Sequence, residues 1–499
     1  MRPPDVHKSI IILGAGPTGL GSAMRLNEQG CGDWLLLEAC NHAGGLASSF
    51  KDGKGFTWDV GGHVQFSHYD YFDDAMDELL GSDGWLHHQR ESWVWMRERF
   101  IPYPFQYNLH RLPAGDLERC LAGLRSLASA PGASRSLDFQ QWMEQTFGAG
   151  ITDVFMRPYN RKVWAFPPEM MSAGWVGERV AVTDLERVLR NVASGKDDTS
   201  WGPNNTFRFP KHGGTGAIWS ACAAQLPKEK LIFNAAVTRV DLPRHEVSTA
   251  DGRTIRYDHL VSTMPLTELI RLSGAVQLAG FAKHDLLFST TNIVGLGLIG
   301  KPRAELHTKC WMYFPEENCP FYRATVFSNY SQGNVPDITR HWSLMLEVSE
   351  SPYKPVEQES LVEEVIQGAL NTHLIENKND IVSIWHYRAP YGYPVPTLNR
   401  DKVFSEIIPY FEQYDVYSRG RFGLWKYEVS NQDHSFMQGV EVVERLLGGR
   451  AEVTAFDCDH ANSKKHSWPF ERWKGASCLG VGGDPARVVP GYRQSPTHS

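Results

Sequence analysis

The chain has 499 residues, which is enough for two or three structural units of about 100 to 200 residues each. Hydrophobic residues make up 42% and charged residues 21%, a composition that is typical of a globular protein and excludes a disordered chain. The formal net charge is -7, so a polyanion-binding surface is not expected, and neither is nucleic acid as a partner.

The eight cysteines are spread along the chain without a CxxC pair or a His/Cys ligand spacing, so we expect no metal site. So few thiols in a long chain favour a reducing compartment, and we expect a cytoplasmic protein. No apolar run approaches the roughly 20 residues that a membrane span needs, and none is predicted. Aromatic residues reach 12%, which suits a large pocket lined by rings.

In chain order, the first predicted element is a buried strand at 9–13. It is followed by the glycines Gly14, Gly16 and Gly19 in a GxGxxG pattern, and then by a helix to about residue 29. A second strand at 34–37 ends at Glu38. This is the pattern of a dinucleotide site, in which backbone N–H groups approach a pyrophosphate and the acid accepts hydrogen bonds from a ribose hydroxyl.

Two further glycine pairs favour one dinucleotide over the other. Gly44-Gly45-Leu46-Ala-Ser48 follows Glu38 directly, and Gly61-Gly62-His63 comes soon after. Several glycine-rich contacts along one chain suit FAD, a long cofactor that runs through its domain, better than a diffusible nicotinamide dinucleotide. We therefore predict bound FAD.

The rest of the chain alternates between helical and strand-like patterns. Strands are predicted within 231–262, with a turn at Asp251-Gly252, and within 280–350. Helices are predicted at 112–127, 138–147, 175–192, 357–371 and 433–448. After about residue 450 the periodicity is lost, and we expect a loosely packed tail.

The remaining motifs are specific to a family. They are Asp59-Val-Gly-Gly-His63-Val-Gln-Phe66-Ser-His68-Tyr69, Pro102-Tyr103-Pro-Phe105-Gln106, Phe155-Met-Arg-Pro-Tyr159-Asn160, Gly177-Glu-Arg179, Trp201-Gly-Pro-Asn204, Trp311-Met-Tyr313, Phe321-Tyr-Arg323, Gly392-Tyr393-Pro and the block from Ser418 to Met437. Taken in order with the glycine motifs, from about residue 9 to 448, the chain resembles the eukaryotic, mainly fungal, UDP-galactopyranose mutases.

The resemblance implies an α/β (α+β multidomain) fold class. Its parts are an FAD-binding Rossmann-like domain of discontinuous segments, a helical-bundle domain and an antiparallel β-sheet domain. The expected boundaries are 1–85, 201–265 and 401–450 for the FAD-binding domain, 111–200 for the helical substrate-binding domain, 86–110 and 266–400 for the antiparallel sheet domain, and 451–499 for a divergent tail that can be flexible.

The resemblance also implies an isomerase that interconverts UDP-galactopyranose and UDP-galactofuranose, a reaction of cell wall biosynthesis. The sugar ring contracts through a covalent adduct with reduced FAD, so there is no net redox change. NADPH or NADH is the expected reductant, and a homo-oligomer is possible.

The site residues follow from the same motifs. Arg179 and Arg323 are expected to act on the diphosphate, since a guanidinium is always charged and binds phosphate oxygens at two points, and His63 is expected to position the flavin. The cofactor-binding residues are expected to be Gly14, Gly16, Gly19, Glu38, Gly45, Leu46, Ser48, Gly61, Gly62, His63, Arg421 and Gln432. The substrate-binding residues are expected to be Tyr103, Gln106, Phe155, Tyr159, Asn160, Trp164, Arg179, Asn204, Tyr313, Arg323, Tyr330, Tyr393, Tyr427 and Asn431. The segment 194–205 and the loop before Arg179 are expected to close over the substrate, as in the family.

Three alternatives stay open. One is an amine-oxidase-like FAD oxidoreductase, which should lack paired diphosphate arginines; another is a mutase for a related nucleotide sugar such as UDP-arabinose; the third is a non-catalytic FAD-binding paralogue. Gln65 and Arg161 are polar where the family pattern is apolar, so either residue can alter the pocket. Without the motifs, the aromatic stripe would more often be helix core, and Tyr330 would as often be a core residue as a ligand.

Overall fold

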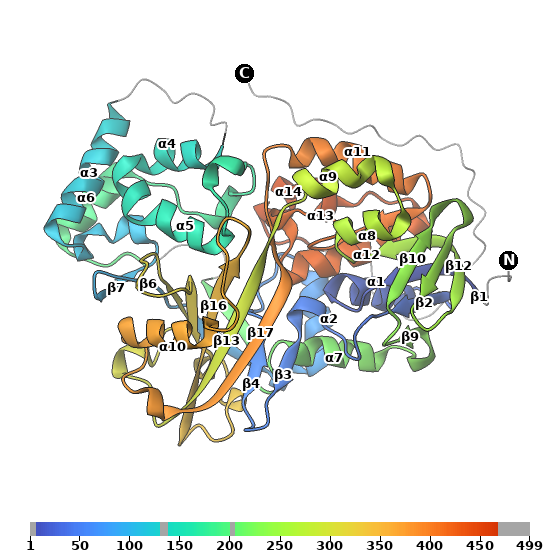
Figure 1. Ribbon diagram of the computed structural model, residues 1–499, viewed down its shortest axis with the longest axis horizontal. Coiled ribbons are helices and arrows are strands. Elements are labelled where there is room, and N and C mark those ends of the chain that lie inside the picture. Colours follow the sequence, from blue (N-terminus) through green and yellow to red (C-terminus); the bar gives the residue numbers. More distant parts are fainter. Residues whose placement is uncertain (1–5, 130–137, 200–204, 468–499) are drawn as a thin grey trace.

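The structure is a computed structural model that describes residues 6–129, 138–199 and 205–467. Figure 1 shows three parts: a group of helices at the upper left, a steep sheet below it, and an α/β part on the right that holds the N-terminal strand. The chain passes repeatedly between the α/β part and the steep sheet, so these two parts contain segments that are far apart in sequence, whereas the helices of the third part all lie within residues 114–194. The predicted substrate residue Asn204 lies outside the described residues.

The α/β part is built on a seven-stranded sheet in the order β10-β11-β12-β1-β2-β9, with β18 also paired to β12. Its strands are β1 (Val6–Leu13), β2 (Trp34–Leu37), β9 (Leu231–Ile232), β10 (Val237–Asp241), β11 (Glu246–Thr249), β12 (Thr254–Ser262) and β18 (Val416–Ser418). Strand β1 runs parallel to both neighbours, and its alternate residues enter two different cores, Ile10 and Ile12 on one face and Ile11 and Leu13 on the other. Burial on both faces explains the unbroken apolar run of this strand.

Helices cover both faces of this sheet (Figure 1). On one face lie α1 (Pro17–Glu28), α2 (Asp70–Leu80), α7 (Gly216–Gln225) and α12 (Gln432–Gly448), and on the other α8 (Leu266–Ser273), α9 (Ala279–His284) and α11 (Arg400–Glu412). Helices α1 and α12 touch backbone to backbone, because a Cβ on Gly21 would lie 2.4 Å from the Phe436 carbonyl oxygen. The hydroxyl of Ser22 donates to the Gly439 carbonyl at 3.0 Å. The helix of the glycine motif is thus held by a segment from the other end of the chain.

The second large sheet has the order β17-β13-β16-β15-β14-β6-β7. Its strands are β6 (Ser92–Met96), β7 (Arg99–Pro102), β13 (Phe288–Ile299), β14 (Trp311–Tyr313), β15 (Arg323–Val326), β16 (His341–Glu350) and β17 (Ile381–Pro394). Every pair is antiparallel except β14 with β6, which is parallel, so the predicted antiparallel sheet is corrected at this pair. The reason is that β6 comes from a distant segment and enters the sheet beside β14 without a hairpin. Helix α10 (Leu361–Asn371) packs on one face.

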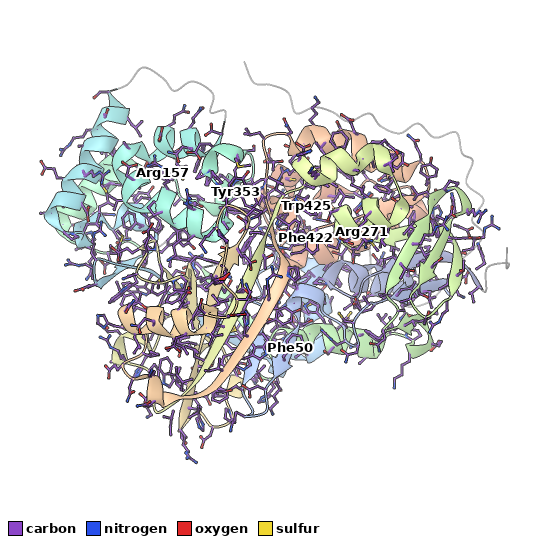
Figure 2. All side chains as sticks on the ribbon, in the orientation of Figure 1. Phe50, Arg157, Arg271, Tyr353, Phe422 and Trp425 are labelled. Carbon is purple, nitrogen blue, oxygen red and sulfur yellow. The ribbon has the colours of Figure 1, made fainter. Side chains whose placement is uncertain are left out.

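Two short strand pairs join the large sheets. Strand β3 (Ser49–Lys51) pairs with β4 (Thr57–Asp59), and β5 (Trp85–Gln89) pairs with β8 (Thr206–Pro210). The ring of Trp58 on β4 lies so close to β13 that a Cβ on Gly295 would be 2.6 Å from it. At a different place, higher in the view, Figure 2 labels Phe422 and Trp425; their ring centroids are 5.1 Å apart, and Trp425 also lies 6.1 Å from Phe288 at the start of β13. These contacts fix the two sheets relative to each other.

The helical part contains α3 (Ala114–Ala128), α4 (Phe139–Ile151), α5 (Arg157–Trp164) and α6 (Leu185–Ser194), with a π-helical turn at Thr152–Met156. Helices α3 and α4 pack through glycines, since a Cβ on Gly150 would lie 2.1 Å from the Arg119 carbonyl oxygen. The helix predicted at 175–192 begins ten residues late. Residues 175–184 instead form turns that include the short helix η7 (Gly177–Arg179), because Gly177 has a φ of +44° and Asp184 caps α6 by accepting from the Arg187 N–H.

Two segments pack differently from what the expected boundaries suggest. Residues 266–286 were expected in the antiparallel sheet domain, but Leu266, Ile270 and Leu286 pack in the core under the parallel sheet. The expected loosely packed tail is packed at least to residue 467, with helices α13 (Val453–Phe456) and α14 (Cys458–Ser463). How the chain divides into independently folding domains is still a prediction.

The segment after residue 450 is held by buried hydrogen bonds and an ion pair. Such contacts produce no apolar periodicity in the sequence, which is why the packing was not predicted. Glu452 forms an ion pair with Arg419, both side chains being fully buried. Glu441 of α12 accepts hydrogen bonds from both the N–H and the hydroxyl of Thr454, at 2.9 and 2.7 Å. Within the described part of the chain, no helix has the length and apolar character needed to cross a membrane.

Candidate functional site

The glycine motif forms a tight turn between β1 and α1. Gly14 has a φ of +102°, and a Cβ there would lie 2.3 Å from the Thr263 hydroxyl oxygen. A Cβ on Gly19 would lie 1.9 Å from the Gly14 carbonyl oxygen, so the helix can start this close to the strand only with glycine at both positions. These glycines were predicted to bind the cofactor. Gly14 and Gly19 are in addition required by the backbone conformation and close packing of the protein itself.

A second glycine turn faces the first. Gly45 lies opposite Gly16, and a Cβ on Gly45 would be 3.3 Å from the Gly16 Cα atom. The Gly44 N–H donates to the Ala15 carbonyl at 2.8 Å, which joins the two turns. Two backbones without side chains thus form a cradle at the N-terminus of α1, where an anionic pyrophosphate is favoured. This donor arrangement fits a dinucleotide.

Glu38 stands at the end of β2 beside this cradle. One of its carboxylate oxygens accepts the Ala15 N–H at 2.6 Å and the other accepts the Cys40 N–H at 2.8 Å. The carboxylate is therefore fixed in direction, as a ribose-binding acid requires. Of the neighbouring predicted residues, Ser48 is buried and Leu46 packs between two cores, so these two shape the cradle wall.

The loop Gly61-Gly62-His63 lies against the second sheet. Gly61 has a φ of +104°, and a Cβ on Gly62 would be 2.9 Å from the Thr325 hydroxyl oxygen. Burial lowers the pKa of His63 to about 4, although Glu347 acts in the opposite direction. The imidazole is therefore neutral at physiological pH, and its buried Nδ1 has no hydrogen-bond partner among the described residues. Such an orphaned nitrogen fits contact with a cofactor that the protein encloses.

Arg323 projects from β15 into a cluster of buried polar side chains. Its Nε and Nη2 donate to the two carboxylate oxygens of Glu347 at 2.8 and 2.7 Å. Glu347 also accepts the Tyr322 hydroxyl at 2.7 Å and the Gly62 N–H at 3.0 Å. Burial would raise the pKa of Glu347, but Arg323 and these donors hold it below its usual range. The positive charge of Arg323 is therefore largely compensated by the carboxylate of Glu347.

Arg421 has no such compensation. It donates to the Gly392 carbonyl and to the Ser430 hydroxyl, and no carboxylate of the described residues is in ion-pair range. Its guanidinium lies 5.1 Å from the ring centre of Tyr393 and 5.5 Å from that of Tyr427. Burial lowers the pKa of Arg421, yet an arginine stays protonated. An enclosed, uncompensated cation next to tyrosine hydroxyls favours an anionic ligand.

The predicted aromatic residues form two groups of rings. In the first, Tyr313 lies 5.4 Å from Tyr103 and 5.3 Å from Tyr159, and Phe155 stacks on Tyr159 at 5.4 Å. Burial and the neighbouring Tyr313 raise the pKa of Tyr159, while Arg323 acts against this, which places the group beside Arg323. The structure therefore brings together four residues that lie up to 210 positions apart (313 − 103).

In the second group, Trp164 lies 5.0 Å from Tyr427 and 5.7 Å from Tyr393. Trp164 is only 2% exposed, and it also packs against Trp175 at 5.0 Å. It therefore supports the two tyrosines from behind and offers no open face for stacking. The Tyr393 hydroxyl lies 3.4 Å from that of Tyr322, which connects this group to the Arg323 cluster.

Arg179 lies apart from the other two arginines. Its Nη2 donates to the Glu428 carbonyl and, at 3.2 Å, to the Oδ1 atom of Asn462. Its guanidinium lies 5.8 Å from the Tyr427 ring centre, on a ring that Arg421 also contacts. The structure thus brings Arg179 to the border of the site, held by neutral oxygens.

Three other predicted residues are turned toward the protein. The Gln106 amide donates to the Ala181 carbonyl, and the Asn160 amide donates to the Met156 carbonyl at 2.8 Å within its own helix. Tyr330 is fully buried among core rings such as Phe209, 5.3 Å away. Its hydroxyl has no partner among the described residues, so the ring packs in the core while the role of the hydroxyl toward the substrate is still a prediction.

The last two predicted residues stand at the start of α12. Asn431 is the exposed N-cap residue, and its side chain makes no capping bond. Gln432 accepts the Trp219 indole N–H at 2.8 Å, which ties α12 to α7. Gln65, polar where the family pattern is apolar, is buried with both side-chain amide atoms lacking partners in the described chain. Arg161 is exposed and lies on the outer side of α5.

Sequence reasoning missed Glu347, Tyr322 and Asn462. Glu347 had a signal, because it is a single acid within the apolar strand 342–348, and an isolated charge in a buried strand needs a partner. Tyr322 directly precedes Arg323 and had no distinguishing feature. Asn462 lies in the segment that was expected to be loosely packed.

One buried cluster contains possible metal ligands. His68, Asp433 and His434 each offer an atom within 4.8 Å of the others, the only such group among the described residues. The His68 Nδ1 is already 2.8 Å from Asp433 Oδ2, and the two imidazoles stack at 4.7 Å. A hydrogen-bonded imidazole–carboxylate pair explains the first two residues without an ion. That the protein has no metal is still a prediction.

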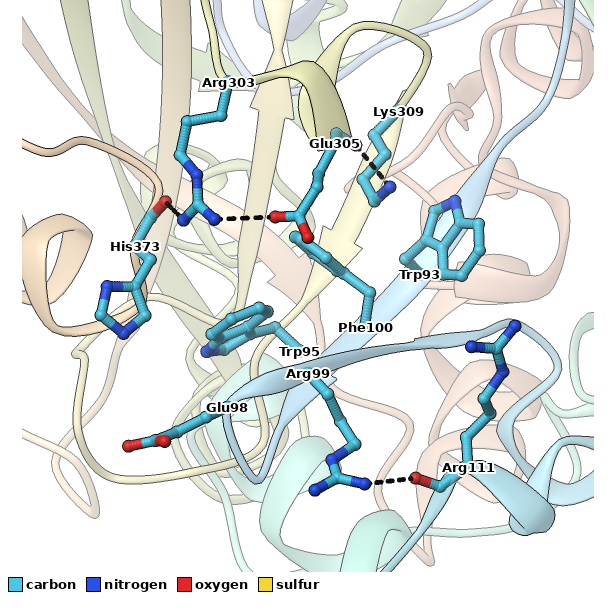
Figure 3. Close-up of a pocket in the computed structure, with 10 residues that line it drawn as sticks. All are labelled: Trp93, Trp95, Glu98, Arg99, Phe100, Arg111, Arg303, Glu305, Lys309 and His373. Atoms are coloured by element: carbon cyan, nitrogen blue, oxygen red, sulfur yellow. Dashed lines mark hydrogen bonds and ion pairs between the residues drawn. The ribbon is translucent and has the colours of Figure 1, made fainter.

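A hollow of about 550 Å³ lies elsewhere, at the outer end of the β6–β7 hairpin (Figure 3). Figure 3 shows Arg303 donating to Glu305 and to the His373 carbonyl, while Lys309 lies near the Trp93 ring. The hollow contains none of the predicted site residues. Its cations Arg111 and Arg303 are paired with carboxylates, and Lys309 donates to the Glu305 carbonyl. Arg421, in contrast, has no carboxylate partner among the described residues.

Comparison with known proteins agrees with this geometry. A family model described as flavin containing amine oxidoreductase matches residues 17–280, which is more than half of the chain. A solved structure of a reduced UDP-galactopyranose mutase is 48% identical, covers 94% of this chain and 99% of its own, and superposes with a TM-score of 0.90. The chain belongs to the flavin-containing amine oxidoreductases and, within them, to the UDP-galactopyranose mutases.

More distant structures share the fold. A putative protoporphyrinogen oxidase from Exiguobacterium sp. 255-15 is 15% identical over 88% of this chain and 98% of its own, with a TM-score of 0.65. A putrescine oxidase bound to putrescine is 14% identical over 89% of this chain and 100% of its own, with a TM-score of 0.60. The predicted fold class is thus confirmed, and the cofactor common to the family is FAD.

Proposed function

We propose that this protein is an FAD-dependent UDP-galactopyranose mutase, which interconverts UDP-galactopyranose and UDP-galactofuranose by ring contraction without net oxidation. The observation that carries the proposal is the position of two arginines. Arg323 shares the carboxylate of Glu347 with the Gly62 N–H of the flavin loop. Arg421 lies against Tyr393, whose hydroxyl is 3.4 Å from that of Tyr322 in the same cluster, so two cationic groups for a diphosphate lie next to the expected flavin position. An amine-oxidase-like oxidoreductase needs no such pair.

The residues that would hold FAD are those of the cradle: Gly16, Gly45 and Glu38 at the pyrophosphate and ribose, and His63 at the isoalloxazine. Reduced FAD would supply the nucleophile for the anomeric carbon. The protein must then hold the sugar over the flavin and stabilise the charge that develops on the leaving diphosphate.

For this second task we assign Arg323, Arg421 and Arg179, with the hydroxyls of Tyr313, Tyr393 and Tyr427 as uncharged donors. Arg421 was predicted to bind the cofactor, and its contacts with Tyr393 and Tyr427 support a role toward the diphosphate as well. The partly buried tyrosine rings of both aromatic groups, backed by the buried Phe155 and Trp164, reduce the access of water, which strengthens each of these interactions.

Further features of the proposal rest on the resemblance. We propose NADPH or NADH as the reductant that activates the flavin, a cytoplasmic location, a homo-oligomer as one possible assembly, and a supply of galactofuranose for the cell wall. We also propose that the enzyme is of the eukaryotic type.

A chromatographic assay tests the activity. Purified protein with dithionite-reduced FAD should convert UDP-galactofuranose to UDP-galactopyranose, and the oxidised protein should not. NAD(P)H should prime many turnovers without stoichiometric consumption. One-to-one consumption would support the oxidoreductase alternative, and conversion of UDP-arabinose alone would assign a different sugar. A reduced enzyme that converts neither sugar would contradict the proposal.

A further inference from the structure

Helix α14 lies between two pieces of the site. It packs against both η7, which carries Arg179, and the short helix η15 (Tyr427–Val429), which carries Tyr427. Asn462 near its end uses both halves of its amide: Oδ1 accepts from Arg179 at 3.2 Å, and Nδ2 donates to the carbonyls of Glu428 at 3.0 Å and Cys458 at 2.8 Å. The Glu428 carbonyl also accepts from Arg179, so the two side chains converge on one oxygen.

The two sides of this junction differ in how firmly they are held. Asp457 caps α14 by accepting the His460 N–H at 3.0 Å, and Lys426 donates to the Ala455 carbonyl at 3.0 Å. These bonds add to those that anchor the preceding helix α13. Arg179, in contrast, sits on turns that contain Gly174 and Gly177, next to a hollow of about 290 Å³. The arginine is therefore the partner that can move.

The contacts of Arg179 are of a kind that a phosphate can displace. The guanidinium has five N–H donors, and among the described residues only Nη2 finds acceptors, both of them neutral oxygens. No carboxylate of the described residues neutralises it. A diphosphate offers several charged acceptors in a geometry that a guanidinium can bind at two points, and such a pair of opposite charges is stronger than a bond from the same guanidinium to a neutral oxygen. Arg179 is thus held lightly at a resting position on the border of the site.

We propose that Asn462 is a positioning residue that holds Arg179 in this resting position and competes with the substrate diphosphate for it. The inference rests on the proposed role of Arg179 in binding the diphosphate. It gives the C-terminal segment, which the sequence left without a function, a part in setting substrate affinity.

The competition predicts opposite effects for two substitutions at one position. Asn462→Ala removes the neutral oxygen that accepts a hydrogen bond from Arg179, so UDP should bind about 2- to 10-fold more tightly. Asn462→Asp places a carboxylate beside the guanidinium, so UDP should bind more weakly, and added salt should reduce this effect. A merely structural role would make both variants bind UDP more weakly.

The experiment is titration of UDP against the full-length FAD protein, followed by flavin fluorescence. Ser463→Ala is the matched control, since Ser463 lines the same hollow but its hydroxyl donates to the His460 carbonyl at 2.8 Å and not to Arg179. Thermal unfolding checks each variant. If Asn462→Asp weakens the packing of α14, Asn462→Ala still shows whether UDP affinity rises or falls when the hydrogen bond to Arg179 is lost.

The same titrations in an Arg179→Ala background complete the cycle. Both Asn462 effects should disappear there. Effects that persist without Arg179, or weaker UDP binding in Asn462→Ala, would overturn the proposal while leaving the mutase function intact. If Arg179→Ala alone leaves UDP affinity unchanged, the assignment of Arg179 to the diphosphate fails as well, and the conversion assay then shows whether the enzyme's function survives it.

Discussion

Arg323 and Glu347 form a two-point ion pair, with Nε to Oε1 at 2.8 Å and Nη2 to Oε2 at 2.7 Å. The Glu347 side chain is 2% exposed, and it also accepts the N–H of Gly62 in the flavin loop. One carboxylate therefore joins the arginine proposed for the diphosphate to the loop proposed for the flavin. A shift on one side of the site is transmitted to the other through these bonds.

Arg323→Ala should destabilise the fold as well as weaken UDP binding. The structure indicates a cost of about 3 to 5 kcal/mol, because the substitution leaves the buried Glu347 charge without its partner. Urea unfolding with flavin release as the signal measures this.

The double variant Arg323→Ala/Glu347→Gln separates the two effects. Removing both charges should restore much of the stability while UDP affinity stays low. A single variant as stable as wild type would contradict the buried-pair argument, and a double variant with wild-type UDP affinity would contradict the assignment of Arg323 to the diphosphate.

Gly14→Val should abolish FAD binding. Its φ of +102° and the 2.3 Å from a Cβ to the Thr263 hydroxyl oxygen mean that valine must distort the turn at the cradle. The added side chain meets the Thr263 hydroxyl of the protein itself. Flavin absorbance of the purified variant is the measurement. Gly32→Ala, where a Cβ meets nothing within 4 Å, should stay yellow.

Trp164→Ala should reduce both stability and UDP affinity. The ring is 2% exposed and supports Tyr393 and Tyr427, so its loss should cost about 3 to 5 kcal/mol and leave both tyrosines misplaced. Trp142, whose ring contacts are with Phe139 and Phe147, is the control in the same helical part. Trp142→Ala should lower the unfolding temperature with little change in UDP affinity. Equal loss of affinity in both variants would refute the supporting role.

Glu441 should make stability depend on pH. Burial raises its pKa to about 8 from an ordinary value of 4.5, against the opposing hydrogen bonds from Thr454. Between these two pH values the folded state binds the proton that the unfolded state has lost, so this group's contribution to stability falls as pH rises through that window. The unfolding temperature, measured from pH 5 to 8, should fall less steeply in Glu441→Gln than in wild type.

The exposed Glu406 provides the control for this measurement. Glu406→Gln on α11 makes the same chemical change at an exposed position outside the buried contacts of Glu441 with Thr454, so the slope of this variant is the reference for the comparison. If Glu441→Gln has the same slope as wild type, Glu441 is ionised in the folded protein and its burial is compensated in another way.

The sequence predicted the features that depend on local order. Gly14, Gly19 and Glu38 lie within 25 residues of one another, and their spacing alone restricts the backbone to one kind of turn. The apolar run 9–13 likewise specified a strand covered on both faces. The aromatic segments around Tyr103, Tyr159 and Tyr313 were found through the family resemblance, and the structure brings them together.

Only the tertiary structure decided the polar partnerships. Glu347 on β16 contacts Arg323 on the neighbouring strand β15 and Gly62 in a distant loop. The hydrophobic periodicity of the sequence contains no information about these contacts. The segment after residue 450 is anchored by Glu452 and Thr454, whose buried partners replace the apolar pattern that sequence analysis looks for. The spacing of apolar residues specifies which face of a helix or strand is buried. The pairing of charged side chains is instead decided when elements that are far apart in the chain pack together.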